Sequence, residues 1–137
     1  MTVLADTGPL YALVDRSDAW HERVTAWWGT ALHQVVIPVS VLPEVSYLLQ
    51  TRIGPEAEQA FIRAVAEGEF ITEPLEPEDV RRAAELMREY ADLPLGFVDA
   101  TVVAIAERLG ACDILTTDRR HFGVIRPQHT KAFELLP

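Results

Sequence analysis

The chain has 137 residues, the length of one domain, and its 49% hydrophobic and 24% charged residues are the proportions of an ordinary globular protein. A disordered tail and a fibrous repeat are thereby excluded. The 12 basic and 21 acidic residues give a net charge of −9, which argues against a general electrostatic attraction to nucleic acid. Nucleic acid stays open as a substrate, because a bound divalent cation reverses the local charge.

Cysteine content and hydropathy predict a soluble, cytoplasmic protein. Cys112 is the only cysteine, so no internal disulfide is expected and a reducing compartment is the default. The N-terminus lacks the basic flank of a secretion signal. The long stretch 25–43 has no Asp, Glu, Lys or Arg, but it contains prolines and polar residues that a membrane-spanning helix would not tolerate well. We expect a single domain over residues 1–137 that does not enter a membrane.

Short apolar runs alternate along the chain with amphipathic segments. The apolar runs predict strands at 3–5, 34–37, 69–72, 114–116 and 124–125. The amphipathic segments, several of them opened by proline or stopped by glycine, predict helices at 8–14, 19–31, 42–50, 55–66, 77–90 and 97–109. This alternation predicts an α/β fold with a parallel sheet covered on both faces.

Four acidic residues are predicted to meet at one edge of this sheet. Asp6 and Asp118 follow predicted strands, and Glu44 and Asp99 lie in the first turns of predicted helices. In a parallel α/β fold the C-terminal ends of strands and the N-terminal ends of helices share one edge, where ligands bind.

Each acid also has a purely structural explanation. Glu44 and Asp99 can complement the dipoles of their helices, Asp118 can cap a turn at 119–121, and Asp6 can hold the turn that follows it. Taken singly, the structural and the functional interpretations weigh equally.

The helical faces favour the functional interpretation. At about 100° per residue, Thr101, Glu107 and Arg108 mark the solvent side of their helix, and Asp99 falls on the apolar side. Glu44 lies on the apolar stripe of its own helix. A carboxylate that faces the core is costly unless it is paired, and no Arg or Lys neighbours either acid in the local sequence.

A divalent metal ion relieves the repulsion expected among four clustered carboxylates. All-oxygen ligation is typical of Mg²⁺ or Mn²⁺, and no Cys/His cluster indicates zinc. One or two such ions are usual in sites that cleave phosphodiester bonds. Arg119 and Arg120 are candidate contacts for the flanking phosphates, or else solvated surface side chains.

Other phosphate chemistries fit the sequence less well. A haloacid-dehalogenase-type hydrolase needs a second acid two residues after its nucleophile, where this chain has Gly8. A response-regulator receiver needs neighbouring acids after its first strand and a lysine after its last. Near its end, this chain offers Arg126 and Pro127 instead. A nucleotide-binding fold needs a glycine-rich loop that the chain lacks.

Four segments together resemble a known family. The segments VLADT (3–7), PEV (43–45), FVDA (97–100) and LTTDRRHF (115–122) have the order and spacing of a PIN domain, and more narrowly of the VapC toxins of toxin–antitoxin pairs. The similarity covers effectively the whole chain. It implies a three-layer fold around a parallel sheet of four or five strands, and Mg²⁺- or Mn²⁺-dependent endoribonuclease activity. The alternative is a catalytically inactive PIN-like module that binds RNA or protein, although such modules have typically lost acids that this chain retains.

The resemblance implies roles for the four acids. Asp6, Glu44 and Asp99 correspond to catalytic metal ligands. Asp118 corresponds to a fourth catalytic acid, which often acts on the metal through water.

Further positions are expected to support this site. Thr117 resembles the family's hydroxyl residue beside the fourth acid, and Thr7 is a second supporting candidate. Gly96 stands where many relatives carry an additional acid, so a second ion would rest mainly on Asp99 and Asp118.

The family also implies two protein partners, a VapB-type antitoxin and a second copy of the chain in a homodimer. Trp20, Trp27 and Trp28 form a stripe at helical spacing, which is a candidate groove for the antitoxin or else part of the core. His21 and His129 are predicted at the surface, and no histidine is assigned a catalytic role.

Overall fold

The computed structural model describes all residues from Met1 to Pro137. Its centre is a five-stranded sheet with the strand order β3-β2-β1-β4-β5, in which every neighbouring pair is parallel. The predicted α/β class with a parallel sheet is confirmed. The strands are β1 (Thr2–Ala5), β2 (Gln34–Pro38), β3 (Ile71–Glu73), β4 (Asp113–Leu115) and β5 (Glu134–Leu136).

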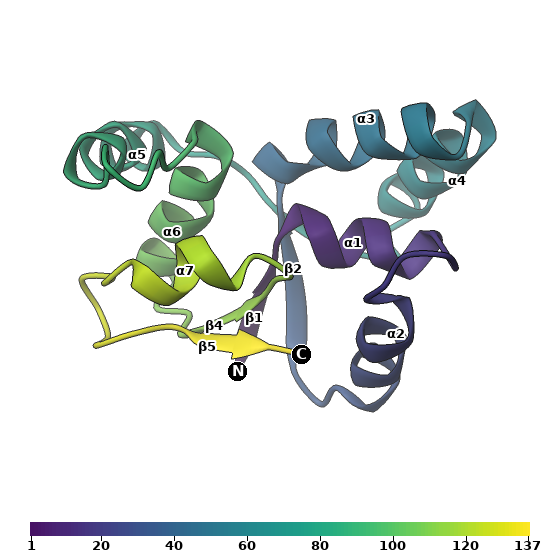
Figure 1. The fold of residues 1–137 in the computed structure, drawn as a ribbon, viewed down its shortest axis with the longest axis horizontal. Helices are drawn as coiled ribbons and strands as arrows, with labels where there is room; N and C mark the ends of the chain where they lie inside the picture. Colours follow the sequence, from purple (N-terminus) through teal and green to yellow (C-terminus); the bar gives the residue numbers. More distant parts are fainter.

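Helices cover both sides of the sheet. Figure 1 shows α1 to α4 on one side of the strands and α5 to α7 on the other. Gly110 ends α6 in the left-handed conformation (φ 68°), which favours glycine. The helices are α1 (Thr7–Val14), α2 (His21–Thr30), the 3-10 helix η1 (Val39–Val41), α3 (Leu42–Arg52), α4 (Pro55–Ala66), α5 (Pro77–Glu89), α6 (Phe97–Leu109) and α7 (Arg119–Val124).

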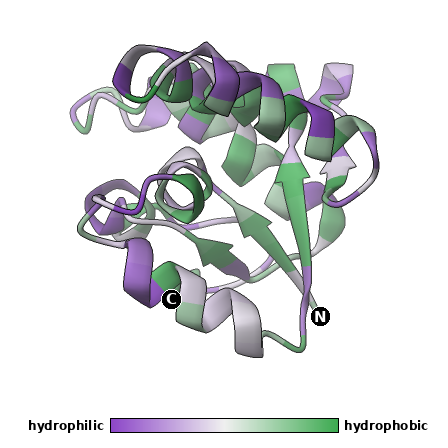
Figure 2. Cartoon of the chain, turned by 90° about the vertical axis from the view of Figure 1, so that its right-hand side faces the viewer, coloured by the Kyte–Doolittle hydropathy of each residue, from purple (hydrophilic) through white to green (hydrophobic).

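The hydrophobic core lies along the central strands and α6. Val3, Leu4 and Ala5 of β1 are fully buried, as are Ile114 and Leu115 of β4. Figure 2 shows these central strands as hydrophobic, with hydrophilic residues on the surrounding helices. None of the helices combines the length and the hydropathy needed to cross a membrane. Because both faces of the sheet are covered, polar side chains can gather at the ends of the strands.

The predicted strand at 124–125 is wrong. Val124 ends α7, and the N–H of Ile125 still donates to the carbonyl of His121 at 3.3 Å, as in a helical turn. The edge strand is instead β5, which pairs with β4. A strand of three residues at the end of the chain is too short to show a periodic hydrophobic pattern.

The predicted solvent side of α6 is wrong at Thr101. This residue is fully buried, and its hydroxyl shares a 2.7 Å hydrogen bond with the hydroxyl of Ser40. The reason is that η1 packs on the side of α6 that the helical pattern left unpaired. The contact fixes the start of α6 against the segment that leads into α3.

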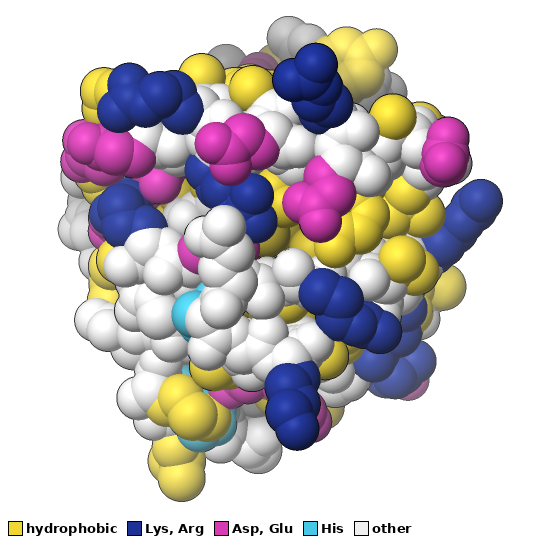
Figure 3. Space-filling view, turned by 90° about the vertical axis from the view of Figure 1, so that its left-hand side faces the viewer, with side chains coloured by type: hydrophobic (Ala, Val, Ile, Leu, Met, Phe, Trp, Pro, Cys, Tyr) yellow, Lys and Arg dark blue, Asp and Glu magenta, His cyan; other side chains and the backbone are white.

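Ion pairs hold α5 and α6 together on the side of the molecule shown in Figure 3, where acidic and basic side chains alternate. Arg108 of α6 donates to Asp79 of α5 at 3.0 Å, and the Asp79 side chain is only 2% exposed. Arg108 also donates to Glu73 at 2.7 Å, and Arg82 donates to Glu107 at 2.7 Å. Each buried charge in this region therefore has an opposite charge beside it.

Candidate functional site

Asp6 lies at the carboxyl end of β1 and is the N-cap residue of α1. The residue is 5% exposed, and its Oδ2 accepts a hydrogen bond from the hydroxyl of Thr116 at 2.9 Å. Burial, together with the negative charges of Asp99 and Asp118, raises the pKa of Asp6 to about 7, against the lowering effect of hydrogen bonds from Thr7 and Thr116. Near neutral pH this carboxyl group is therefore only partly ionised when the chain alone surrounds it.

Asp99 lies in the first turn of α6 and is half-buried. Burial, together with the neighbouring charges of Asp118 and Glu44, raises its pKa to about 6, whereas His121 lowers it. In both Asp6 and Asp99 burial is the largest cause of the raised pKa, and the charge of neighbouring carboxylates adds to it.

Glu44 lies in the first turn of α3 and is exposed, so its predicted position on the apolar side of that helix is wrong. The buried stripe of α3 runs through Val45 and Leu49, and Glu44 points away from this stripe because successive residues of a helix are turned by about 100°. The hydroxyl of Thr7 donates to Glu44 Oε1 at 2.7 Å and so joins the start of α1 to the start of α3.

Asp118 follows β4 and is the N-cap residue of α7. Its Oδ1 accepts from the backbone N–H of His121 at 3.1 Å, and its Oδ2 lies 2.6 Å from His121 Nδ1. A carboxylate partner at Nδ1 favours the tautomer with the hydrogen on that nitrogen, which leaves the Nε2 lone pair available. Sequence reasoning gave His121 no role, although its position three residues after an N-cap acid was visible in the sequence.

The cluster fits a divalent cation by the chemistry of its donors. Asp99, Asp118 and His121 each offer one ligand atom, and these atoms lie within 4.8 Å of one another. Asp6 contributes a further carboxylate that interacts with both acids. No Arg or Lys forms an ion pair with any of these acids, and the only basic side chain in contact with them is the imidazole of His121. Crowded carboxylates without a basic partner are the setting in which a metal ion supplies the missing positive charge.

The hydroxyl that supports Asp6 belongs to Thr116, one residue before the predicted Thr117. Thr116 is fully buried, donates to Asp6, and accepts from the backbone N–H of Asp118 at 2.9 Å, so it links two acids of the cluster. Thr117 instead packs against Gly8, where a methyl group on Gly8 would come within 2.1 Å of the threonine hydroxyl. Thr117 therefore holds the first turn of α1 close to the loop after β4.

The two predicted phosphate contacts differ in their surroundings. The guanidinium group of Arg119 donates to the carbonyls of Leu135 at 3.3 Å and Pro137 at 2.8 Å, and so covers the outer edge of β5. Arg120 is exposed and forms no ion pair. The guanidinium group of Arg120, unlike that of Arg119, is therefore free to contact a phosphate.

The three tryptophans of the predicted groove line no common cavity. Trp27 and Trp28 pack partly buried against the core and meet edge to face, with ring centroids 6.3 Å apart, but each lines a different cavity. Trp20 instead lies beneath the guanidinium groups of Arg23, at 4.3 Å, and Arg119, at 5.7 Å.

His21 and His129 are half-buried. His21 Nδ1 lies 2.6 Å from the carbonyl of Ala12, and His129 Nε2 lies 2.6 Å from the carbonyl of Ala111. Neither ring belongs to the carboxylate cluster.

Comparison with known proteins identifies the class. The PIN domain family model matches residues 3–126, so the chain belongs to the PIN-domain family. It is 32% identical over 98% of its length to Ribonuclease VapC26 of Mycobacterium tuberculosis, all of which is covered. The chain is therefore a member of the VapC ribonucleases within that family, and the resemblance predicted from the four segments is confirmed.

Solved structures show the same fold. The Mycobacterium tuberculosis toxin VapC20, described as cleaving the sarcin–ricin loop, superposes with a TM-score of 0.81 at 24% identity over 86% of this chain and 91% of that one. VapBC2 of Rickettsia felis, bound to a DNA fragment from its promoter, gives a TM-score of 0.70 at 15% identity with both chains fully covered. These likenesses confirm the PIN-like arrangement of sheet and helices.

Proposed function

We propose that the protein is a metal-dependent endoribonuclease that hydrolyses phosphodiester bonds in RNA. The observation that carries this proposal is the crowding of Asp6, Asp99 and Asp118 at one edge of the sheet, with two raised pKa values and no arginine or lysine to balance them. The name of VapC26 as a ribonuclease and the RNA cleaved by VapC20 support RNA as the substrate.

Mg²⁺ or Mn²⁺ would be held by Asp6, Asp99 and Asp118, with Glu44 and His121 at the rim of the cluster. When bound, such an ion lowers the pKa of the attacking water and stabilises charge on the phosphate. Gly96 leaves open space where relatives have an additional acid, so the acids present favour one tightly bound ion over two.

The residues around the cluster position it for this work. Thr116 fixes the carboxylate of Asp6, and Thr7 fixes that of Glu44. Asp118 orients the ring of His121. Because each of these side chains is held by a neighbour, the ligands need little rearrangement when RNA arrives.

The RNA itself would lie across α3 and the loop after β4. Thr7, Glu44, Tyr47 and Leu48 line a cavity of about 250 Å³ beside the cluster, and Tyr47 is 65% exposed. An exposed aromatic ring next to a cleavage site is suited to stacking on a base of single-stranded RNA. Arg120 is the candidate contact for a flanking phosphate.

A VapB-type antitoxin and a second copy of the chain remain the proposed protein partners. The support for the antitoxin is the likeness to VapBC2 of Rickettsia felis, together with membership of the VapC family. We also propose that the protein is located in the cytoplasm. Co-expression with the product of a neighbouring small gene, followed by size-exclusion chromatography, tests both partners, and a monomer that captures nothing would contradict them.

The experiment that tests the activity compares Asp99→Asn with the matched exposed control Asp92→Asn. We expect the wild-type protein and Asp92→Asn to cleave total RNA in Mg²⁺ or Mn²⁺, with sequencing of the product ends giving the target. Asp99→Asn should lose about 100-fold or more, because several kcal/mol of transition-state stabilisation depend on the metal. RNA binding without cleavage by the wild-type protein would instead favour the inactive PIN-like module.

A further inference from the structure

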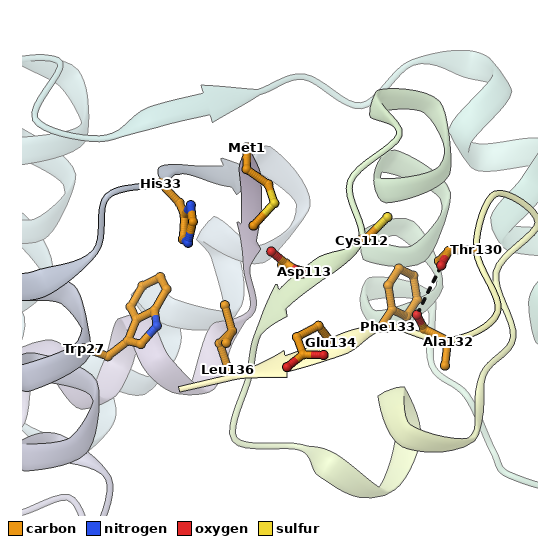
Figure 4. A pocket seen from close by; sticks show the side chains of 10 residues that line it. All are labelled: Met1, Trp27, His33, Cys112, Asp113, Thr130, Ala132, Phe133, Glu134 and Leu136. Carbon is orange, nitrogen blue, oxygen red and sulfur yellow. Dashed lines mark hydrogen bonds between the residues drawn. The ribbon is translucent and has the colours of Figure 1, made fainter.

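The largest cavity lies at the opposite edge of the sheet from the carboxylate cluster, where β1, β2 and β4 begin. Its volume is about 620 Å³, within the range of small-molecule sites. Figure 4 shows the rings of Trp27 and Phe133 at two ends of this cavity, with Met1, Asp113 and Glu134 between them. We call it the amino-edge cavity.

Asp113 is a buried carboxylate that the protein leaves without a partner. The residue is 6% exposed, it forms no ion pair, and no donor of the chain makes a hydrogen bond to its side chain. Figure 4 shows its carboxylate pointing from β4 into the amino-edge cavity. The carboxylate oxygens of Asp113 are not fully enclosed, since they are not among the buried polar atoms that lack a partner, so a ligand in the cavity can reach them.

A second carboxylate stands beside the first. Glu134 of β5 is the register partner of Asp113 in the parallel β4–β5 pair. Partners in register project from the same face of neighbouring strands, which lie about 4.8 Å apart. Like charges in this position repel each other, so a cation bound between Asp113 and Glu134 would relieve that repulsion.

The lining of the cavity favours an organic cation over a hydrated metal ion. No lysine or arginine lines it, and the one positively charged group of the chain at its wall, the amino group of Met1, forms no ion pair with Asp113 or Glu134. Trp27, Phe133 and Leu136 give it apolar sides. An indole ring attracts an ammonium or guanidinium group, and apolar walls accept the alkyl chain that carries it.

We propose that the amino-edge cavity binds an organic cation, an ammonium or guanidinium group on a short alkyl chain, between the carboxylates of Asp113 and Glu134 and the ring of Trp27. The site is separate from the carboxylate cluster and does not depend on the proposed ribonuclease activity. Its cation comes from a free amine or from an arginine side chain of another polypeptide.

The test uses two probes of the same shape, butylguanidine, which is charged, and butylurea, which is neutral. Calorimetric titration of the full chain should show binding of butylguanidine and at least about ten-fold weaker binding of butylurea, the loss expected when a buried charge loses its partner. Asp113→Asn should weaken butylguanidine binding by a similar factor, and Glu134→Gln by less because Glu134 is exposed. Tighter binding of agmatine than of acetylarginine methylamide would indicate a free amine as the source of the cation. Tighter binding of acetylarginine methylamide would indicate an arginine side chain.

Two variants outside the cavity serve as controls for loss of folding. Asp92→Asn and Asp99→Asn should bind butylguanidine as the wild-type protein does, because neither residue lines the cavity. Equal affinity for butylguanidine and butylurea, or unchanged affinity in both Asp113→Asn and Glu134→Gln, would overturn the proposal. So would a site that takes Mg²⁺ but not butylguanidine in the Asp99→Asn background.

Discussion

Asp79 and Asp6 are two aspartates buried to nearly the same extent in opposite electrostatic surroundings. They are 2% and 5% exposed. Asp79 accepts hydrogen bonds from the guanidinium group of Arg108 on both of its oxygens, at 3.0 to 3.2 Å. Asp6 accepts hydrogen bonds only from uncharged groups, the hydroxyl of Thr116 and the backbone of Thr7, and interacts with two further carboxylates. The same residue type thus stabilises the fold in one place and stores uncompensated charge in the other.

This difference separates structure from function more clearly than burial does. A buried carboxylate with an arginine partner needs no ligand to balance its charge, because the ion pair joins two helices of the fold. An unpaired cluster lowers the stability of the chain alone, so its presence indicates a ligand that restores the balance. Substitutions at the paired carboxylate and at the unpaired cluster should therefore have separate effects.

The largest expected effect lies on the paired side. Arg108→Ala leaves Asp79 buried without its partner and should lower the free energy of unfolding by about 3–5 kcal/mol. Urea denaturation measures the change, and Arg120→Ala, which removes an exposed arginine, should stay within about 0.5 kcal/mol of the wild type. Equal effects of the two substitutions would show that burial of Asp79 costs little.

The unpaired side should respond to pH in the metal-free protein. The pKa values of Asp6, about 7, and Asp99, about 6, exceed the ordinary value of 3.8, so the folded state binds more protons than the unfolded chain. Their contribution to stability is complete below pH 3.8 and is lost as the pH rises through 6 and 7. In EDTA, unfolding at pH 5.5 should therefore cost more than at pH 8, by on the order of 2 kcal/mol from Asp6.

Asp6→Asn is the control for this pH dependence. The variant should flatten the profile and should be more stable than the wild type at pH 8 in EDTA, because the costly charge is gone. A wild-type profile that Asp6→Asn leaves unchanged would contradict the assignment.

The hydrogen bond from Thr116 to Asp6 should matter for catalysis more than the contact made by Thr117. Thr116→Val keeps the shape of the side chain and removes the donor, and it should lower RNA cleavage by about 10–100-fold. Thr117→Val is the matched neighbour and should have a smaller effect, because Thr117 acts through packing against Gly8. A larger loss with Thr117→Val would restore the assignment made from the sequence.

The smallest expected effect concerns Tyr47. Tyr47→Ala should raise the KM for RNA by roughly five-fold or more, since stacking on one base is worth about 1–3 kcal/mol, while Tyr47→Phe keeps the ring and the affinity. Binding of Mg²⁺ should raise the melting temperature. This increase should be the same in both variants as in the wild-type protein. If Tyr47→Ala instead dissolves a dimer and leaves KM unchanged, the exposed ring belongs to a protein interface.

Local sequence signals were sufficient for the scaffold and for the edge where the acids gather. The apolar runs located β1, β2 and β4, and proline and glycine located the ends of α4 and α6, because these features act over a few residues. Asp6, Asp99 and Asp118 lie at the predicted edge because strand ends and helix starts share it in any parallel α/β fold.

What the sequence could not give depended on contacts between distant segments. Successive residues of an extended segment point in opposite directions, so choosing between Thr116 and Thr117 required the register of the loop after β4. Thr101 is buried against Ser40 of η1, and the buried stripe of α3 runs through Val45 and Leu49 and leaves Glu44 exposed. The hydrophobic pattern of a single helix does not indicate which of its sides a distant segment covers.

The central claim is that a divalent ion binds to the carboxylate cluster and displaces protons from it into the solvent. Calorimetric titration of Mn²⁺ at pH 6.5, in buffers of different ionisation enthalpy, measures binding and proton release together. We expect saturable binding of Mn²⁺ with release of close to one proton per ion, and a proton release that falls toward zero at pH 8.5. Asp99→Asn should lose both the binding and the proton release. Binding without proton release, or heats that are the same in Asp99→Asn, would contradict it.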